Sequence, residues 1–587
     1  MNIFANIKKE IVKQVNQALD RKVAIKEADL VFPPDSKMGD ISLPCFGLSK
    51  ELKKSPNDIA QMLLTELSSC AQELSSVESM VATGPYLNFT LDKGQLVKKI
   101  FAEIKKCPQD FGKNKVGKKK RVMIEYSNGN THKEYHIGHL RNISYGDAVN
   151  HILAANGFDA IPVSYINDFG IHVAKTLWWL YHKENETAKN FFENFKKGGI
   201  TPGEKGRFLG QMYAEATKQM ELKSQAKEEV GLIMKQVETR KGEYYKLWKE
   251  TRKWSIELFD QIYRELKVHF REVFYENEVI EEGFKIVADL YEKHILVKSQ
   301  GAVIANLEKY NLGVLLFLRS DGTALYPVAD LPLAMLKFKK YKLHKSIYVV
   351  DIRQGLYFEQ LSKVMELLGY KQELMHLGYD FVKLPEGMMS SRTGNIVTYQ
   401  ELSEKMLANA KTETRNKHED WTENKIDMVG KQIAYGAMKF EMIKVSRDKT
   451  ITFDIEKALR FDGYTAAYLQ YTCARINSIL RKADVVETRL IASVSVKNLV
   501  ETKEHDLIMK LAKYSLAVEL AGTNYEPSEI AKYLFELAQQ FNDYYHDVPI
   551  LKAPEEIKLA RLALIKAVKQ VIANGLTLLG IETIEEM

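Results

Sequence analysis

Two histidines stand three residues apart in His136-Ile137-Gly138-His139, where an expected loop turns into a helix. A helix N-terminus presents unpaired N–H groups and partial positive charge, so it attracts phosphate. Gly138 has no Cβ and lets a base or ribose approach the backbone. Both imidazoles fall on one helical face, where their N–H groups could donate to phosphate oxygens as charge builds during attack at the α-phosphorus. The pattern predicts nucleotide chemistry, and the alternative is that the two histidines only cap an ordinary helix.

A second segment, Pro385–Asn395, combines glycines and small residues with one fixed cation after an expected strand. Such a loop can fold over a triphosphate, although loops of this composition are common and the signal is weak by itself. Together with a His-x-Gly-His helix it becomes specific, because that pattern arises by chance on the order of 0.02 times in such a chain. The residues that we expect to contact ATP here are Met389, Ser390, Ser391 and Arg392.

The elements that must hold these residues alternate between strand and helix. A buried strand at 122–127 leads through a polar loop into a helix at 136–156, which Gly157 closes, and a second strand follows at 160–166. Further strands are expected at 302–307, 313–318 and 346–351, and further helices at 327–338 and 354–370. This alternation predicts a doubly wound parallel sheet, interrupted by a charged helical insertion at about 184–280 in which we identify no chemistry.

Three domains are expected along the 587 residues. Residues 1–112 read as an α+β unit, with helices at 2–19 and 48–67 and a strand at 81–91. Residues 121–400 form the α/β Rossmann-type catalytic domain. Residues 401–587 read as an all-α helix bundle.

The composition narrows the class of protein. Lys and Arg number 84 against 77 Asp and Glu, a net charge of +7 that permits a polyanionic partner without requiring one. The four cysteines are far apart, so neither a zinc ribbon nor a disulfide framework is expected, and we expect no dedicated metal site. No apolar run approaches the ~20 residues that span a bilayer, and the N-terminus lacks the apolar core of a signal peptide. We expect a cytoplasmic protein without membrane contact.

The two phosphate-binding segments resemble the HIGH and KMSKS signatures of class I aminoacyl-tRNA synthetases. The surrounding sequence is similar to arginyl-tRNA synthetases over essentially the whole chain. The residues that carry this resemblance are Asn128, Gly129, Asn130, Lys133, Gly146-Asp147, Asn167-Asp168-Phe169-Gly170, Tyr326, Asp330 and Gln354.

The resemblance implies an arginine pocket, and the chemistry of the ligand agrees with it. A guanidinium has five donors and no acceptor, so its pocket needs carboxylates and hydroxyls. By resemblance, Glu125, Tyr326 and Asp330 face the guanidinium. The remaining arginine-binding residues are Asn128, together with Asn130 and Gln354 at the α-amino end. Without the resemblance, an acid at a strand end and one on a helix are more often surface residues.

The resemblance also implies that tRNA(Arg) is held at two places. The first domain resembles one that contacts the tRNA elbow, and Asn88 falls where the family places a D-loop contact. The C-terminal helices resemble an anticodon-binding domain, in which we expect Tyr468, Gln470, Arg475 and Tyr545 to contact tRNA. We expect a monomer.

The implied reaction has two steps and no covalent enzyme intermediate. The carboxylate of L-arginine attacks the α-phosphate of ATP, which carries Mg2+, and arginyl-adenylate then passes its arginyl group to the 3′-terminal ribose of the tRNA. By resemblance, the first step itself requires bound tRNA. Catalysis is assigned to His136, His139, Lys133 and Arg392, which act by positioning and electrostatics.

Three positions depart from the family pattern. Met388 and Ser391 stand where lysines are expected in the phosphate loop, and the family loses only the second of these as a rule, with the lysine matching Lys133 thought to substitute. Gly129 replaces a proline, and Ala466-Ala467 replace a Gly-Pro pair. These differences put loop rigidity and phosphate contacts in doubt, but not the reaction class.

Three other readings stay open. Another class I synthetase is disfavoured by the absence of zinc-type cysteines and of an editing insertion. A nucleotidyltransferase of the same fold leaves the two flanking domains without a role. A non-enzymatic RNA-binding protein would bind tRNA without turning over ATP.

Overall fold

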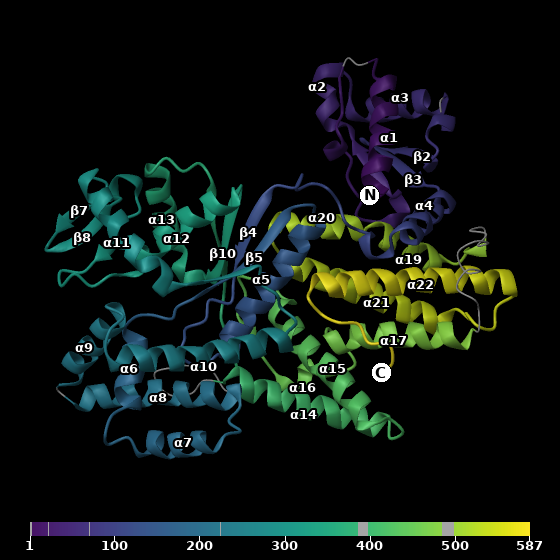
Figure 1. Ribbon diagram of the computed structural model, residues 1–587. Coiled ribbons are helices and arrows are strands. Elements are labelled where there is room, and N and C mark those ends of the chain that lie inside the picture. The colour runs from purple at the N-terminus through teal and green to yellow at the C-terminus, as the bar shows by residue number, and fades with distance from the viewer. Residues whose placement is uncertain (1–2, 21–22, 70, 224, 386–396, 484–497) are drawn as a thin grey trace.

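The computed structural model describes residues 1–587 except 1–2, 21–22, 70, 224, 386–396 and 484–497. The first unit projects from the rest of the molecule (Figure 1). Its antiparallel sheet has the order β1-β3-β2, and its helices lie before, between and after these strands. The elements are α1 (Ile3–Ala18), β1 (Ile41–Pro44), α2 (Ser49–Leu52), α3 (Pro56–Ser69), β2 (Val77–Thr83), β3 (Tyr86–Leu91) and α4 (Lys93–Lys106).

Two expected elements of this unit are divided. The helix expected at 48–67 is broken into α2 and α3, because Lys53 adopts the left-handed conformation and Pro56 can only begin a helix. The strand expected at 81–91 is the end of β2, a turn at Gly84-Pro85 and β3. Gly84 has a positive φ of 55°, which suits a tight turn between antiparallel strands.

The central sheet confirms the expected fold class. Its five strands are parallel in the order β11-β10-β4-β5-β6, with helices packed against it. The strands are β4 (Arg121–Glu125), β5 (Asp159–Ile166), β6 (Glu272–Tyr275), β10 (Lys345–Asp351) and β11 (Glu373–Tyr379). The chain leaves β4 toward β5 on one side and later returns to β10 on the other. The sheet therefore switches direction between β4 and β10, and ligands of such sheets bind beyond the carboxyl ends of the strands at that place.

Two expectations about the sheet are wrong. The strands expected at 302–307 and 313–318 do not join it; they are β8 (Ala302–Asn306) and β9 (Val314–Leu318) of a separate antiparallel sheet with β7 (Val297–Ser299). Their short connection permits only antiparallel pairing, since parallel strands need a crossover of a dozen or more residues. Conversely, β6 lies in the region expected to be wholly helical. Its four residues stand among charged neighbours, and so short a run carries too little periodicity to be recognised.

The helices of the catalytic unit fall into two groups. One group packs on the sheet: α5 (Ile137–Ala155), α11 (Glu276–Glu292), α12 (Tyr326–Tyr341) and α13 (Gly355–Leu367). The other group forms the helical insertion between β5 and β6 (Figure 1). This insertion has its own apolar core. It consists of α6 (Ile171–Leu180), α7 (Glu186–Lys197), α8 (Pro202–Leu222), α9 (Ala226–Glu238) and α10 (Glu243–Glu265).

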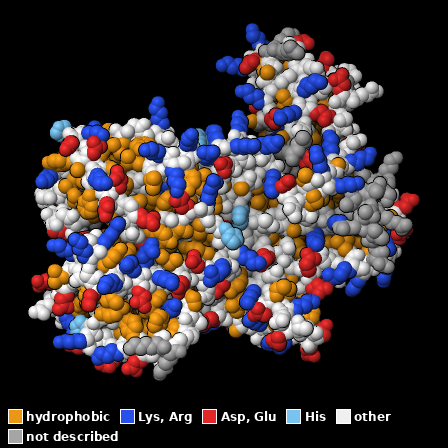
Figure 2. Space-filling model, viewed as in Figure 1, with side chains coloured by type: hydrophobic (Ala, Val, Ile, Leu, Met, Phe, Trp, Pro, Cys, Tyr) orange, Lys and Arg blue, Asp and Glu red, His pale blue; other side chains and the backbone are white. Residues whose placement is uncertain are grey.

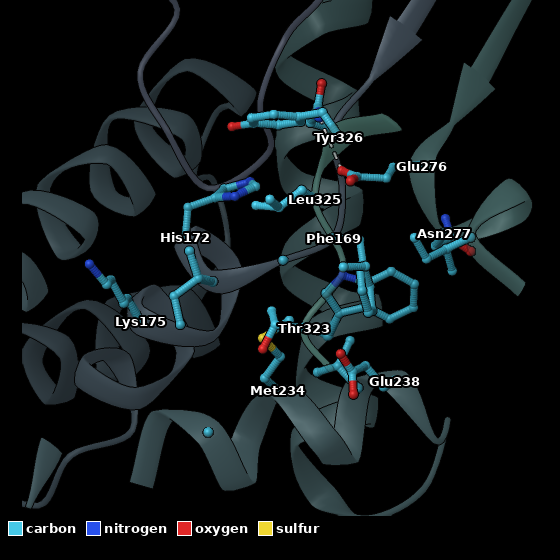
Figure 3. A pocket seen from close by; sticks show the side chains of 18 of the residues that line it. Phe169, His172, Lys175, Met234, Glu238, Glu276, Asn277, Thr323, Leu325 and Tyr326 are labelled. Atoms are coloured by element: carbon cyan, nitrogen blue, oxygen red, sulfur yellow. Dashed lines mark hydrogen bonds between the residues drawn. The ribbon is translucent and has the colours of Figure 1, made fainter. Parts of the chain in front are cut away.

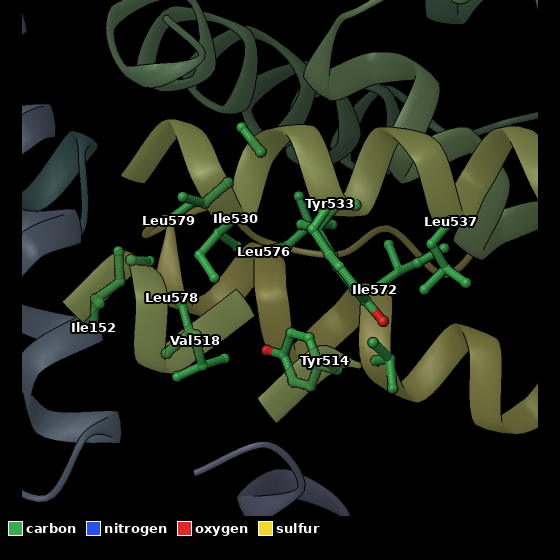
Figure 4. Close-up of a cluster of buried hydrophobic side chains, with 14 of the residues drawn as sticks. Ile152, Tyr514, Val518, Ile530, Tyr533, Leu537, Ile572, Leu576, Leu578 and Leu579 are labelled. Carbon is green, nitrogen blue, oxygen red and sulfur yellow. The ribbon is translucent and has the colours of Figure 1, made fainter. Parts of the chain in front are cut away.

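The C-terminal unit is helical, as expected, apart from the two-residue strand β13 (Ile451–Thr452), which pairs with β12 (Val382–Lys383). Its helices are α14 (Tyr399–Lys417), α15 (Glu423–Ile443), α16 (Ile455–Ala458), α17 (Ala466–Lys482), α19 (Thr502–Ala512), α20 (Tyr514–Asn524), α21 (Pro527–Asp547) and α22 (Glu555–Leu578). Ile152, on the last turns of α5, is buried against α20, α21 and α22, so the catalytic helix and the C-terminal bundle share one hydrophobic core (Figure 4).

Candidate functional site

The N-terminus of α5 is capped by the two histidines singled out in the sequence. His136 is the N-cap residue, and its Nδ1 accepts a hydrogen bond from the Gly138 N–H at 3.1 Å. The Nδ1 of His139 accepts from the His136 N–H at 3.2 Å, and the two ring centroids lie 3.9 Å apart. A neutral imidazole that accepts at Nδ1 carries its proton on Nε2. Capping therefore leaves both Nε2–H groups as donors, and the capping and phosphate-binding interpretations are compatible.

Both imidazoles are held neutral. Burial, followed by the nearby Lys133 ammonium, lowers the pKa of His136 to about 4. Burial, His136 and then Lys133 lower the pKa of His139 well below its usual value. Lys133 Nζ lies 4.8 Å from the centre of the Tyr213 ring of α8, and no hydrogen bond or ion pair to it is found within the described residues. One cation and two N–H donors thus stand together at the end of a helix.

The segment after the expected phosphate loop is paired to this helix start. His136 forms an antiparallel bridge with Thr398, and the Tyr399 N–H donates to the Tyr135 carbonyl at 2.7 Å. Before the loop, the buried Arg141 of α5 donates to the carbonyls of Asp380 and Phe381 at 2.6 and 2.9 Å. Both ends of the loop are therefore fastened to α5. Met388, Met389, Ser390, Ser391 and Arg392 lie outside the described residues.

Beside this helix start is a cavity of about 820 Å³. Its walls come from the loop before α5, from the helical insertion, from the start of α11 and from the connection between β9 and α12. Tyr326 and Glu276 lie together at one end, and Met234 and Glu238 lie at the other (Figure 3). Of the residues predicted from the sequence, Asn130, Lys133 and Tyr326 line the cavity.

Glu276 lines the cavity and is a candidate site residue that the sequence analysis missed. It is the first residue of α11, directly after β6, and its Oε2 accepts from Asn167 Nδ2 at 3.1 Å. Burial, followed by the neighbouring Asp330 and Asp168, raises the pKa of Glu276 to about 8. An acid at the carboxyl end of a sheet strand could have marked it as a candidate, but β6 was not recognised as a strand from the sequence.

Asp330 lies one turn after Tyr326 in α12, near enough to Glu276 to influence its pKa. Its Oδ2 accepts a hydrogen bond from the Tyr357 hydroxyl at 2.5 Å. Burial raises the pKa of Asp330 to about 7, with a further contribution from Glu125, while the Tyr357 hydrogen bond and Lys337 oppose the shift. Glu276 lines the cavity, whereas Asp330 is a close neighbour that does not. A cationic ligand that approached these two carboxyl groups would favour their ionised forms.

Glu125 has a partner within the protein. Its carboxylate is ion-paired with the ammonium of Lys337, whose side chain is fully buried. The Lys337 Nζ also lies 5.2 Å and 5.0 Å from the centres of the Phe274 and Tyr348 rings. Glu125 does not line the cavity. The structure thus places this acid beneath the site, close enough to influence Asp330, with its charge already compensated.

The other predicted arginine-binding residues are divided between the site and its surroundings. Asn130 is joined to Asn167 by a parallel bridge at the cavity wall. The buried Oδ1 of Asn128 has no hydrogen-bond partner among the described residues, so it is available as an acceptor. Gln354 is exposed at the start of α13 and is not brought to the cavity.

Four of the five predicted tRNA-binding residues lie on α17 and α21, and three of them, Tyr468, Arg475 and Tyr545, lie close together. Arg475 donates to Asn542 Oδ1 at 2.5 Å and lies 5.8 Å from the Tyr545 ring centre, while Asn542 donates to the Tyr468 hydroxyl at 2.8 Å. Gln470 is fully buried and donates to the Gln432 and Glu582 carbonyls, so it has a structural role there. Asn88 in β3 is only 6% exposed.

Basic and acidic side chains are intermixed over the visible face, and no single-signed patch dominates it (Figure 2). Within the described residues there is no group of three or more His, Cys, Asp or Glu side chains that could hold a metal. In the same part of the chain, every helix is too short or too polar to cross a membrane.

Three family models match the chain in succession. "Arginyl tRNA synthetase N terminal domain" matches residues 5–91, "tRNA synthetases class I (R), catalytic domain" matches 103–455, and "DALR anticodon binding domain" matches 469–587.

Individual proteins are similar over nearly the full length. The chain is 37% identical to an arginine–tRNA ligase of Bdellovibrio bacteriovorus over 95% of this chain and 94% of that protein. It is 33% identical to the corresponding Clostridium botulinum protein over 99% and 100%. The solved arginyl-tRNA synthetase of Thermus thermophilus superposes with a TM-score of 0.79 at 26% identity, covering 99% of this chain and 100% of that one.

Proposed function

Because the chain belongs to the arginine–tRNA ligase family, we propose how its residues divide that family's reaction between them. The enzyme uses ATP to convert L-arginine to arginyl-adenylate and transfers the arginyl group to the 3′ end of tRNA(Arg). The observation that supports our assignment is one cavity whose lining includes Lys133, from the loop before α5, and Glu276 with Tyr326. At one side of it, two Nε2–H donors and the Lys133 ammonium meet at the start of α5. At the other, two carboxyl groups with raised pKa values lie beside Tyr326.

In the activation step, the arginine carboxylate attacks the α-phosphorus of ATP and pyrophosphate leaves. His136 and His139 donate from Nε2 to phosphate oxygens whose negative charge grows during attack. Lys133 supplies the cation at the same helix end. We assign contacts with the triphosphate to Arg392, together with Met389, Ser390 and Ser391. Mg2+ arrives on the ATP phosphates and screens their charge.

In the arginine pocket, Asp330 and Glu276 receive the guanidinium, and the Tyr326 hydroxyl completes the acceptor set. Two carboxylates facing one guanidinium can make charge-assisted, bidentate hydrogen bonds. Asn128 and Asn130 hold the α-amino end. Glu125, paired with Lys337, acts on the ligand indirectly, through its charge near Asp330. Gln354 contacts the ligand only if α13 moves toward the site.

The tRNA is held by both flanking units. Residues 1–112 receive the elbow, with Asn88 as their contact, and the helices of 401–587 receive the anticodon arm at Tyr468, Arg475 and Tyr545. Gln470 supports that surface from within. The enzyme acts as a monomer in the cytoplasm.

Deleting residues 1–112 should weaken tRNA binding while arginine still binds. The affinity for tRNA should also fall steeply as the salt concentration rises, because counterions are released on binding. Normal charging by the truncated enzyme at low tRNA concentration would overturn the role of the first unit.

Aminoacylation with labelled arginine and bulk tRNA tests the overall function, and charging with another amino acid or tRNA binding without ATP turnover would contradict it.

The role of the His139 Nε2–H group can be tested separately, because the side-chain amide of asparagine can replace Nδ1 of histidine and that of glutamine can replace Nε2. His139→Asn keeps the cap and should lose about a hundredfold in kcat. His139→Gln keeps a donor near Nε2, so it should retain more activity while losing about 1 kcal/mol of stability with the cap. The reverse ranking of activities would show that His139 only caps α5.

A further inference from the structure

A buried carboxylate joins the helical insertion to the arginine pocket. Asp168 follows β5, and its side chain is fully buried. Arg252 of α10 donates from Nε to Asp168 Oδ2 at 2.5 Å. Asn277, the second residue of α11, donates its backbone N–H to Asp168 Oδ1 at 3.0 Å and its side-chain amide to Oδ2. Asp168 is thus shared between a cation from the insertion and the helix that begins with Glu276.

Two neighbouring residues, Asn167 and Asp168, both hold the start of α11, and we call this pair of contacts the clamp. Asn167 donates to Glu276 while Asp168 accepts from Asn277, so two consecutive residues of one loop hold two consecutive residues of α11. Asn167 is also held from the other side, since its N–H donates to the Gly129 carbonyl at 3.0 Å and its carbonyl accepts from the Thr131 N–H at 3.0 Å. The clamp therefore sets the position of Glu276 relative to the loop that carries Asn130.

Helix α10 braces the same structure with several side chains. The Arg252 guanidinium lies 4.2 Å from the centre of the Tyr275 ring, which immediately precedes Glu276. The Trp248 indole N–H donates to the Asp168 carbonyl at 2.7 Å. The buried Ser255 hydroxyl accepts from the His132 N–H at 3.0 Å, next to Lys133. The helical insertion, in which the sequence analysis identified no functional residues, therefore forms part of the wall of the site.

We propose that Arg252 is a positioning residue for arginine selection: by neutralising Asp168 it holds Asn277, and through it Glu276, at the guanidinium end of the cavity. This inference rests on the proposed role of Glu276 as a guanidinium partner. A buried carboxylate left without its cation is costly, so the clamp would rearrange or take up a proton when Arg252 is removed. Among the described residues, the side-chain contacts of Arg252 are with Asp168, Trp248 and Tyr275 and do not include Lys133, His136 or His139, so we expect no direct contact with ATP.

The test compares Michaelis constants in ATP–pyrophosphate exchange with saturating tRNA(Arg). Arg252→Gln should raise the KM for arginine at least tenfold and leave the KM for ATP within twofold. Lys253→Gln, on the next residue of α10 and largely exposed, is the matched control and should change neither. Equal changes in both constants would reduce Arg252 to a general stabilising role and overturn the proposal.

A double-variant cycle separates this proposal from the function on which it rests. Once Glu276 is replaced by Gln, adding Arg252→Gln should raise the KM for arginine by less than a further twofold. Additive effects would show that Arg252 does not act through Glu276. An unchanged KM in Glu276→Gln alone would instead reject the proposed role of Glu276. If Arg252→Gln does not fold, Asn277→Ala removes one bond of the clamp and should raise the KM for arginine at least threefold, with no change overturning the proposal.

Discussion

The phosphate end and the arginine end of the site are built in different ways. Lys133, His136 and His139 come from one short segment, and the histidines are oriented by hydrogen bonds to backbone groups within three residues. The arginine end brings together Asn130, Glu276 and Tyr326 from three segments that are remote in sequence. Local hydrogen bonds can orient the first set, whereas only packing of the insertion, sheet and α12 can assemble the second. Phosphate binding should therefore tolerate changes in the insertion that arginine binding does not.

The largest effect should come from the charged pair beneath the arginine end. Glu125→Gln leaves the Lys337 ammonium buried without its counter-charge, which should destabilise the catalytic unit by about 3–5 kcal/mol. Thermal unfolding would show this as a lower Tm. Glu125→Gln combined with Lys337→Met removes both charges and should recover most of the loss. If Glu125→Gln kept its Tm and raised only the KM for arginine, Glu125 would be a direct guanidinium ligand.

The next effect concerns the cation of the phosphate end. Losing the Lys133 ammonium in a water-poor site should cost about 3–4 kcal/mol of transition-state stabilisation. Lys133→Ala should therefore lower kcat at least a hundredfold with little change in arginine binding. Lys175→Ala, which removes another cavity-lining lysine, should have a much smaller effect on kcat. Near-normal turnover of Lys133→Ala would make Arg392 the main phosphate cation.

At the arginine end, a single carboxylate should control substrate affinity. Asp330→Asn removes one charge from a charge-assisted contact and should cost about 2–4 kcal/mol of arginine binding. The KM for arginine should rise at least tenfold while tRNA affinity, measured by filter binding, barely changes. An unchanged KM would reject the assignment of Asp330 to the pocket.

Arginine binding should depend on pH in this range, whereas ATP binding should not. The pKa values of about 8 for Glu276 and about 7 for Asp330 mean that both groups hold protons increasingly as the pH falls through this range. Arginine binds the ionised forms, so its KM should fall as pH rises from 6.5 to 8.5, by up to about tenfold per unit for each proton released. His136 and His139 stay neutral throughout, so the KM for ATP should not follow this profile. Glu276→Gln should remove the upper inflection; an unaltered profile would show that another group titrates.

The smallest effect should come from restoring the family residue in the phosphate loop. Met388→Lys adds an ammonium where Lys133 already supplies positive charge. Activity should stay intact, and the KM for ATP should be unchanged or lower. A marked loss of kcat would show that the uncharged side chain is required at this position.

Sequence patterns predicted the alternating strands and helices of the catalytic unit, the start of α5 and its closure at Gly157, because these depend on contiguous residues. They were wrong about β8 and β9, which form their own sheet, and about the region that holds β6. Strand pairing depends on which segments meet after folding, and a four-residue strand has too little periodicity to stand out from charged neighbours. The missed Glu276 follows from the missed β6.

The sequence by itself determined how the start of α5 is capped, since His136 and His139 are oriented by backbone groups of their own segment. Only the tertiary structure decided which carboxylates remain available to a cationic ligand. Glu125 and Asp330 are equally plausible acids in sequence, yet Lys337 forms an ion pair with Glu125, while Asp330 accepts a hydrogen bond from the uncharged Tyr357 hydroxyl. The strength of a charge pair depends on the distance between the two groups and on their burial. Both are decided by packing of segments that are remote in sequence, so a single segment does not encode them.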